Sequence, residues 1–200
     1  MTLATREVPL EFRAHFVHAA LCPGCPLIRD TYGDQLAKKA LRVRAASRAY
    51  PELARVDVEQ TRGAEQAAGY RTRAKLVADA RGALGLFARG SHDLVDIPEC
   101  LVLHPELARV VAELRSLSAG SEIVGVDLAL VGDAVMLTLI APLEAARAPL
   151  VELACELARR SPAVQSVAIS RRKPDAVQLL GGEHEVVFGP PELRASAGEV

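Results

Sequence analysis

Residues 124–140 constrain the fold most strongly, because apolar and polar residues alternate there on both sides of a turn signal. Apolar residues occupy every second position of the first segment, the period of a half-buried strand, at Val124, Val126, Leu128 and Leu130. Gly132 and Asp133 separate this segment from the apolar run AVMLTLI. The two segments therefore predict an antiparallel hairpin.

Helix and strand patterns continue on both sides of this hairpin. Pro105 opens a helix to about residue 117 with apolar residues at positions i, i+3, i+4 and i+7, and a second helix begins near Pro149. Cys155 lies within the second helix beside its leucine stripe, so we expect it to be buried. Strands are predicted at 163–170, 176–180 and 183–189. From residue 124 the order is β-β-α-β-β-β, which indicates an α+β fold with packed helices and a mainly antiparallel sheet.

Residues 69–100 predict three short strands, with turns at Arg81-Gly82 and Gly90-Ser91. Alternation in the first strand assigns Arg71, Arg73 and Lys75 to one face, and Tyr70, Thr72, Ala74 and Leu76 to the other. Three cations on one face are suited to phosphate contact. They also discourage edge-to-edge aggregation of strands, and the sequence leaves both interpretations open.

The N-terminal region has a different character. Residues 1–30 look irregular, a helix capped by Asp34 fits residues 32–50, and 51–68 read as a connection with a short helix after Pro51. We therefore expect a cysteine-containing region at 1–68 and a central domain at 69–200. Residues 1–90 carry 15 Lys and Arg against 9 Asp and Glu, an excess that suits either phosphate binding or a solvated surface.

The sequence shows no sign of a membrane or secretory segment. No apolar run approaches the length that spans a bilayer, and the N-terminus lacks the apolar core of a signal peptide. We therefore expect a cytoplasmic protein with no membrane partner. In that reducing setting, closely spaced cysteines indicate metal binding or catalysis more often than a disulfide.

Three cysteines are candidate metal ligands. Cys22 and Cys25 form a CxxC in a Pro/Gly loop, and Cys100 follows a predicted strand in DIPEC. The pattern fits a redox dithiol, part of a zinc or iron–sulfur site, or no function. His15 and His18 precede the CxxC and are either further candidate ligands or ordinary loop or helix histidines. No GxGxxG, GxxxxGK[ST], HExxH or GxSxG motif occurs, so no catalytic residue is predicted.

Several segments, in their order along the chain, carry a family resemblance: CPGCP, GYRTRAKLV, LGLFARGSHDLVDIPECLVLHP and VAISRRKPDAVQLLGGE. From about residue 14 to 190 the chain resembles the class I S-adenosylmethionine-dependent RNA (uracil-5-)-methyltransferases, which form 5-methyluridine in rRNA or tRNA. The resemblance covers the family's N-terminal and central regions. It implies that RNA is the partner and that Arg71, Arg73 and Lys75 contact it.

The same resemblance implies what this chain lacks. The family's Rossmann-like domain binds S-adenosylmethionine and supplies the catalytic cysteine, and no matching site occurs here. We therefore expect a chain that is inactive alone, with a partner chain as one source of the missing domain. The alternatives are a non-enzymatic RNA-binding accessory module and a degenerate iron–sulfur or zinc protein.

The family holds a 4Fe-4S cluster on four cysteines. Three of these positions match Cys22, Cys25 and Cys100, and the first falls on Phe16. The resemblance therefore implies a cluster with an incomplete ligand set. Zinc on the three cysteines and one histidine is the remaining option.

Overall fold

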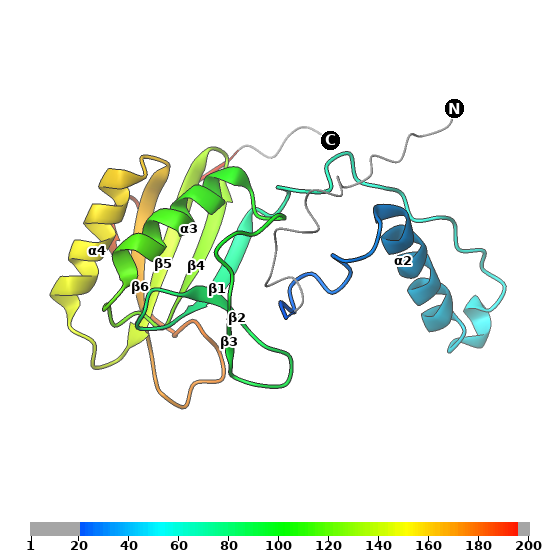
Figure 1. Ribbon diagram of the computed structural model, residues 1–200, viewed down its shortest axis with the longest axis horizontal. Helices are drawn as coiled ribbons and strands as arrows, with labels where there is room; N and C mark the ends of the chain where they lie inside the picture. The colour runs from blue at the N-terminus through cyan, green and yellow to red at the C-terminus, as the bar shows by residue number, and fades with distance from the viewer. Residues whose placement is uncertain (1–20, 196–200) are drawn as a thin grey trace. The chain divides into compact units, whose positions relative to one another are not determined.

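A single mixed sheet organises residues 73–188 in the computed structural model, which describes residues 21–195 (Figure 1). Its strands lie in the order β3-β2-β1-β4-β5-β6-β7. Their bounds are β1 Arg73–Ala78, β2 Leu84–Phe87, β3 Leu94–Asp96, β4 Gly125–Val131, β5 Ala134–Pro142, β6 Val164–Arg172 and β7 His184–Phe188. All neighbouring strands are antiparallel except β5 and β6, which are parallel. The predicted α+β class and mainly antiparallel sheet are confirmed.

The predicted hairpin at 124–140 is confirmed as β4 and β5. Val131 pairs with Ala134 across the turn, where Gly132 has a φ of 61°, a conformation that favours glycine. Leu128 pairs with Leu137, and both side chains are fully buried. The period-2 alternation therefore places its apolar residues in the core, as the sequence predicts.

Two helices cover one face of this sheet (Figure 1). They are α3 (Pro105–Ser118) and α4 (Arg147–Arg160), and α4 connects the parallel strands β5 and β6. The predicted inward positions are buried except Leu117, which is half-buried, and Leu107, Leu114 and Leu157 are 0% exposed. Burying each such side chain contributes about 1.5–3 kcal/mol, so this layer supplies much of the stability of the sheet.

The opposite face of the sheet is partly covered by the segment 173–183. Leu179 lies against Gly125, and the amide of Gly181 donates to Ser170 Oγ at 2.9 Å. The strand predicted at 176–180 is wrong, because this segment forms bends. Val177 and Gln178 are exposed, Leu179 and Leu180 are half-buried, and Arg172 donates to the carbonyl of Ala176. A short apolar run between turn residues is compatible with either arrangement.

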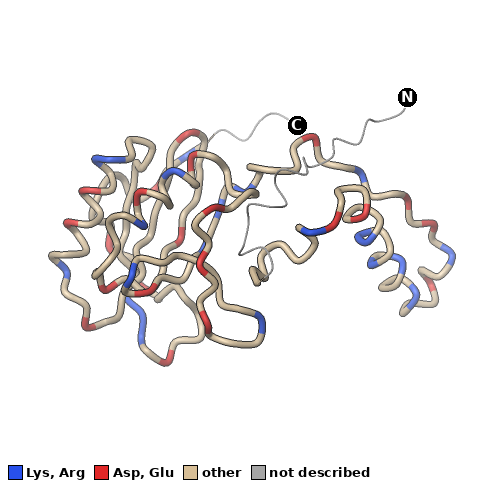
Figure 2. Tube along the Cα trace, viewed as in Figure 1, with Lys and Arg blue, Asp and Glu red and all other residues tan. Residues whose placement is uncertain are grey.

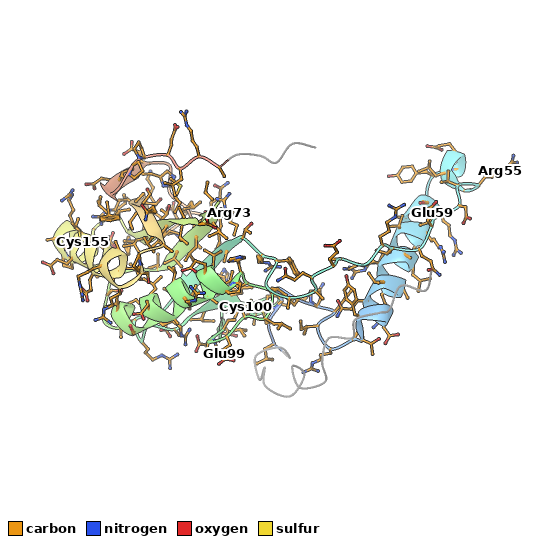
Figure 3. The ribbon with its side chains drawn as sticks, turned by 90° about the horizontal axis from the view of Figure 1, so that it is seen from above. Arg55, Glu59, Arg73, Glu99, Cys100 and Cys155 are labelled. Carbon is orange, nitrogen blue, oxygen red and sulfur yellow. The ribbon has the colours of Figure 1, made fainter. Side chains whose placement is uncertain are left out.

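Two local predictions are wrong. Cys155 is exposed (Figure 3), because α4 turns its 150, 153, 154 and 157 positions inward and residue 155 lies on the far side. The cap of the N-terminal helix is Thr31, whose Oγ1 accepts a hydrogen bond from the amide of Asp34 at 3.1 Å. Asp34 instead occupies the first turn, where its charge suits the helix dipole.

The chain divides into two compact units, residues 24–67 and residues 68–195 together with 21–23. The first contains α2 (Tyr32–Ser47) and the short 3₁₀ helix Pro51–Leu53, which confirms the two predicted helices. Ala40 is the buried residue of α2, and Leu41 and Val43 are more than half exposed. Within residues 21–195, no helix has the length and apolar character needed to cross a membrane.

Candidate nucleic-acid interface

Strand β1 presents two cations on the sheet face opposite to α3 and α4. The side chains of Arg73 and Lys75 are 64% and 48% exposed, whereas Leu76 is buried in the core. The predicted alternation is confirmed from Arg73 to Leu76. It is wrong for Tyr70 and Thr72, which precede the strand and are exposed. Figure 3 labels Arg73 on the β1 ribbon, and Figure 2 shows basic and acidic residues interspersed over this unit. The two cations therefore meet solvent from one strand, two residues apart.

A buried carboxylate joins these cations from the neighbouring strand. The register of β1 on β4 pairs Lys75 with Asp127, which is 7% exposed. Arg73 donates from Nε and Nη2 to the two Asp127 oxygens, at 3.2 and 2.8 Å, and Lys75 Nζ lies 3.8 Å from Oδ2. Hydrogen bonding to Asp127, followed by its charge, raises the pKa of Arg73. We call these three residues the charge triad.

The charge triad carries one net positive charge, and Asp127 pairs with Arg73 through two hydrogen bonds. A bidentate arginine–carboxylate pair is stronger and more directional than a single neutral hydrogen bond. Sequence reasoning missed Asp127, although it is the single charged residue between Glu122 and Asp133. Its partner on β1 is 54 residues distant in the chain, so strand pairing was needed to identify it.

Arg71, the third predicted cation, lies just before β1. Its backbone forms a parallel bridge with Leu103, donating to the carbonyl of Val102 at 2.7 Å and accepting from the amide of His104 at 2.9 Å. The residue is half-buried. The structure thus fixes its backbone against the segment that follows Cys100.

The predicted metal ligands are described at three positions. Cys22 and Cys100 are half-buried free thiols, and Cys100 packs against the hydrophobic core beside the start of α3. Cys25 is half-buried, and its carbonyl accepts from the amide of Ile28 at 3.0 Å. Phe16, the residue at the missing ligand position, lies outside the described residues, as do His15 and His18.

The assignment of Cys22, Cys25 and Cys100 as metal ligands stays a prediction. Among residues 21–195, no group of three or more His, Cys, Asp and Glu side chains is arranged to hold a metal ion. Three thiolates also leave one iron of a four-iron cluster without a protein ligand. No step of the function proposed below is therefore assigned to a metal.

Sequence comparison relates the chain to proteins named RNA methyltransferases, which confirms the resemblance. An uncharacterized RNA methyltransferase of Geobacter sulfurreducens is 36% identical over 100 residues, covering 48% of this chain and 20% of that protein. One of Nitrosomonas europaea is 34% identical over 95 residues, covering 47% of this chain and 24% of that protein. One of Streptococcus agalactiae is 27% identical over 190 residues, covering 86% and 42%. No family model matches the chain.

A solved structure supports the fold. The chain superposes on the Pyrococcus abyssi tRNA (uracil-54, C5)-methyltransferase, solved in complex with S-adenosyl-L-homocysteine, with a TM-score of 0.57 and 16% identity. The match covers 88% of this chain and 43% of that one. The chain thus spans less than half the length of the proteins that it resembles.

Proposed function

From this relationship to RNA methyltransferases, we propose that the chain is the N-terminal and central part of an RNA uracil-5-methyltransferase, acting on rRNA or tRNA. The observation that carries the proposal is how much of the chain is matched. One relative matches over 86% of the chain, and the solved structure over 88%. In this proposal, residues 68–195 hold the RNA while methyl transfer takes place elsewhere.

The charge triad supports the RNA-binding part of the proposal. Arg73 and Lys75 are exposed side by side on a sheet face, so a phosphate group can reach both without displacing a core residue. Phosphate contacts supply much of the affinity of proteins for nucleic acids, and they position the strand. Asp127 limits the net charge, which favours moderate affinity and hence release of the RNA.

Methyl transfer requires groups that we do not assign to residues 21–195. S-adenosylmethionine, when bound, supplies the methyl group, and doubly wound parallel sheets bind such nucleotides at the carboxyl ends of their strands. The described sheet contains one parallel pair, β5 and β6. We assign the methyl-transfer residues to the additional length that the relatives have, located in the same polypeptide or in a partner chain.

An RNA-binding titration tests the proposed interface. Fluorescence anisotropy of a labelled oligouridine of about 12 nucleotides should report binding that weakens as salt increases. The double variant R73A/K75A should bind several-fold more weakly, with a salt slope reduced by about 0.7 for each phosphate that the variant no longer neutralises. The control R109A removes an exposed arginine from α3, on the other face of the sheet.

Absence of wild-type binding at low salt would refute the interface. An equal reduction of affinity in R109A would instead indicate that overall charge, and not the charge triad, is responsible.

Calorimetry tests whether the S-adenosylmethionine site lies outside these residues, as proposed. Titrating S-adenosylmethionine into residues 1–200 should give no saturable heat, because the proposal places that site outside these residues. Stoichiometric binding would contradict this part of the proposal and leave the RNA interface untouched.

A further inference from the structure

The hairpin of β2 and β3 presents two rings near its tip. Phe87, at the end of β2, is 39% exposed, and His92 in the connecting turn is also exposed. Their ring centroids are 5.2 Å apart with an interplanar angle of 72°, an edge-to-face contact. Such a contact covers at most one face of one ring, so other ring faces remain available. We call Phe87 and His92 the aromatic pair.

The turn that carries His92 is closed by hydrogen bonds. The amide of Ser91 donates to the carbonyl of Ala88 at 3.1 Å, and the amide of Ala88 donates to the carbonyl of Asp93 at 2.8 Å. Gly90 has a φ of 76° with open space around it, which permits the tight turn. The two rings are therefore held by a defined backbone and need little further ordering to bind a ligand.

The base of the hairpin is fixed to α3. Arg115 donates to both oxygens of Asp96, at 2.6 and 2.7 Å, and Asp96 Oδ1 also accepts from the amide of Leu84 at 3.2 Å. A Cβ at Gly85 would lie 1.8 Å from the carbonyl oxygen of Val95, so the strands approach more closely there than any other residue allows. The hairpin is thus attached rigidly to the core.

The strand register places Phe87, the strand member of the aromatic pair, on the same face as the charge triad. Val77 pairs with Gly85, and Phe87 pairs with Leu94. Because side chains alternate along strands, Phe87 shares its face with Val77 and therefore with Lys75 and Arg73. The paired residues of β1 and β2 end at Val77 and Gly85, and Lys75 and Phe87 are each the next residue on this face beyond that pair. A cation of β1 and an aromatic ring of β2 therefore lie on the same face of the sheet.

We infer that the aromatic pair stacks an unpaired base of single-stranded RNA, while Lys75 and the exposed Arg89 of the turn contact the flanking phosphates. The inference rests on the proposed RNA binding and specifies how the RNA is held. Single-stranded RNA is commonly bound by aromatic stacking beside cations. Within residues 84–96, all of which the structure describes, Phe87 is the one large apolar side chain that is exposed, too little apolar surface for a stable protein interface.

Two probes separate stacking from charge. One is a labelled oligouridine of about 12 nucleotides, and the other is an abasic strand of the same length that keeps the phosphates. F87A should weaken binding of the oligouridine by about 5- to 150-fold, the range for removing one stacked base. It should leave binding of the abasic strand and the salt slope unchanged. F87W should restore binding, because a larger ring also stacks.

The matched control is F188A. It removes a phenylalanine of similar exposure, 37%, from β7 at the opposite edge of the same sheet, and should change neither affinity. Circular dichroism confirms that each variant is folded. Oligouridine binding by F87A equal to wild type would overturn the stacking inference and leave the proposed function intact. Absence of RNA binding by the wild-type protein would overturn both.

Discussion

At the scale of single residues, Asp127 determines how much positive charge the proposed RNA interface presents. It is nearly buried, yet its carboxylate faces the two most exposed cations of β1. Replacing it with asparagine removes a negative charge and keeps the shape. Arg73 and Lys75 are exposed enough to be solvated without it, so the structural cost is limited.

D127N should therefore bind RNA more tightly and with a steeper salt dependence than the wild type. Its free energy of unfolding should fall by about 1 kcal/mol, the usual contribution of a hydrogen-bonded pair. Anisotropy and urea denaturation measure the two effects. E152Q is the control, because it removes the same charge from the exposed side of α4. Unchanged or weaker RNA binding by D127N would show that Asp127 orients Arg73 and does not limit the charge.

At the scale of elements, the attachment of the β2–β3 hairpin depends on pH. Hydrogen bonds from Arg115, with its positive charge, lower the pKa of Asp96 from its ordinary value of 3.8. A carboxyl with a lowered pKa stabilises the folded state at pH values above its ordinary pKa. This stabilisation disappears as the pH falls through the lowered pKa. The hairpin should therefore detach more easily under acidic conditions.

R115M tests this attachment. Its melting temperature should lie below that of the wild type at neutral pH, and the difference should shrink as the pH falls below about 4. The control R109A removes an exposed arginine from the same helix and should melt like the wild type at each pH. A difference in melting temperature between the wild type and R115M that stays constant with pH would contradict the role of Asp96.

The elements were predictable where one period dominated a long segment. β4, β5, α3 and α4 follow from alternation or from an apolar stripe, because each buries one face against the core. The conformation of residues 176–180 was not predictable, because this segment and its neighbour Gly181 contact Gly125 and Ser170 in other strands. Cation positions on β1 were likewise predictable. Their partner Asp127 and the aromatic pair depend on the register between strands, which a single sequence does not specify.

At the scale of the whole molecule, the two units differ in how much core they have. Residues 68–195 contain the hydrophobic cluster of the sheet, whereas α2 in the other unit buries Ala40 alone. A helix of 16 residues with so little packing is marginally stable in water. Hydrogen exchange should therefore be fast at the amides of α2 and slow in β4 and β5.

L139A sharpens this comparison. It removes a fully buried side chain from β5 and should destabilise the sheet unit by about 2–5 kcal/mol. Exchange in β4 and β5 should accelerate while exchange in α2 stays the same. If hydrogen exchange accelerated equally in both units, the two units would unfold cooperatively.

The pairing of Lys75 with Asp127 has a consequence for synthesis of the protein. β1 and β4 are neighbours in the sheet, but β2, β3 and α3 separate them in the chain. During translation β1 leaves the ribosome well before β4, so its arginine and lysine first emerge without their carboxylate partner. Nascent chains that stop short of β4 would thus display unneutralised cations, and the RNA of the ribosome itself is the first polyanion within their reach.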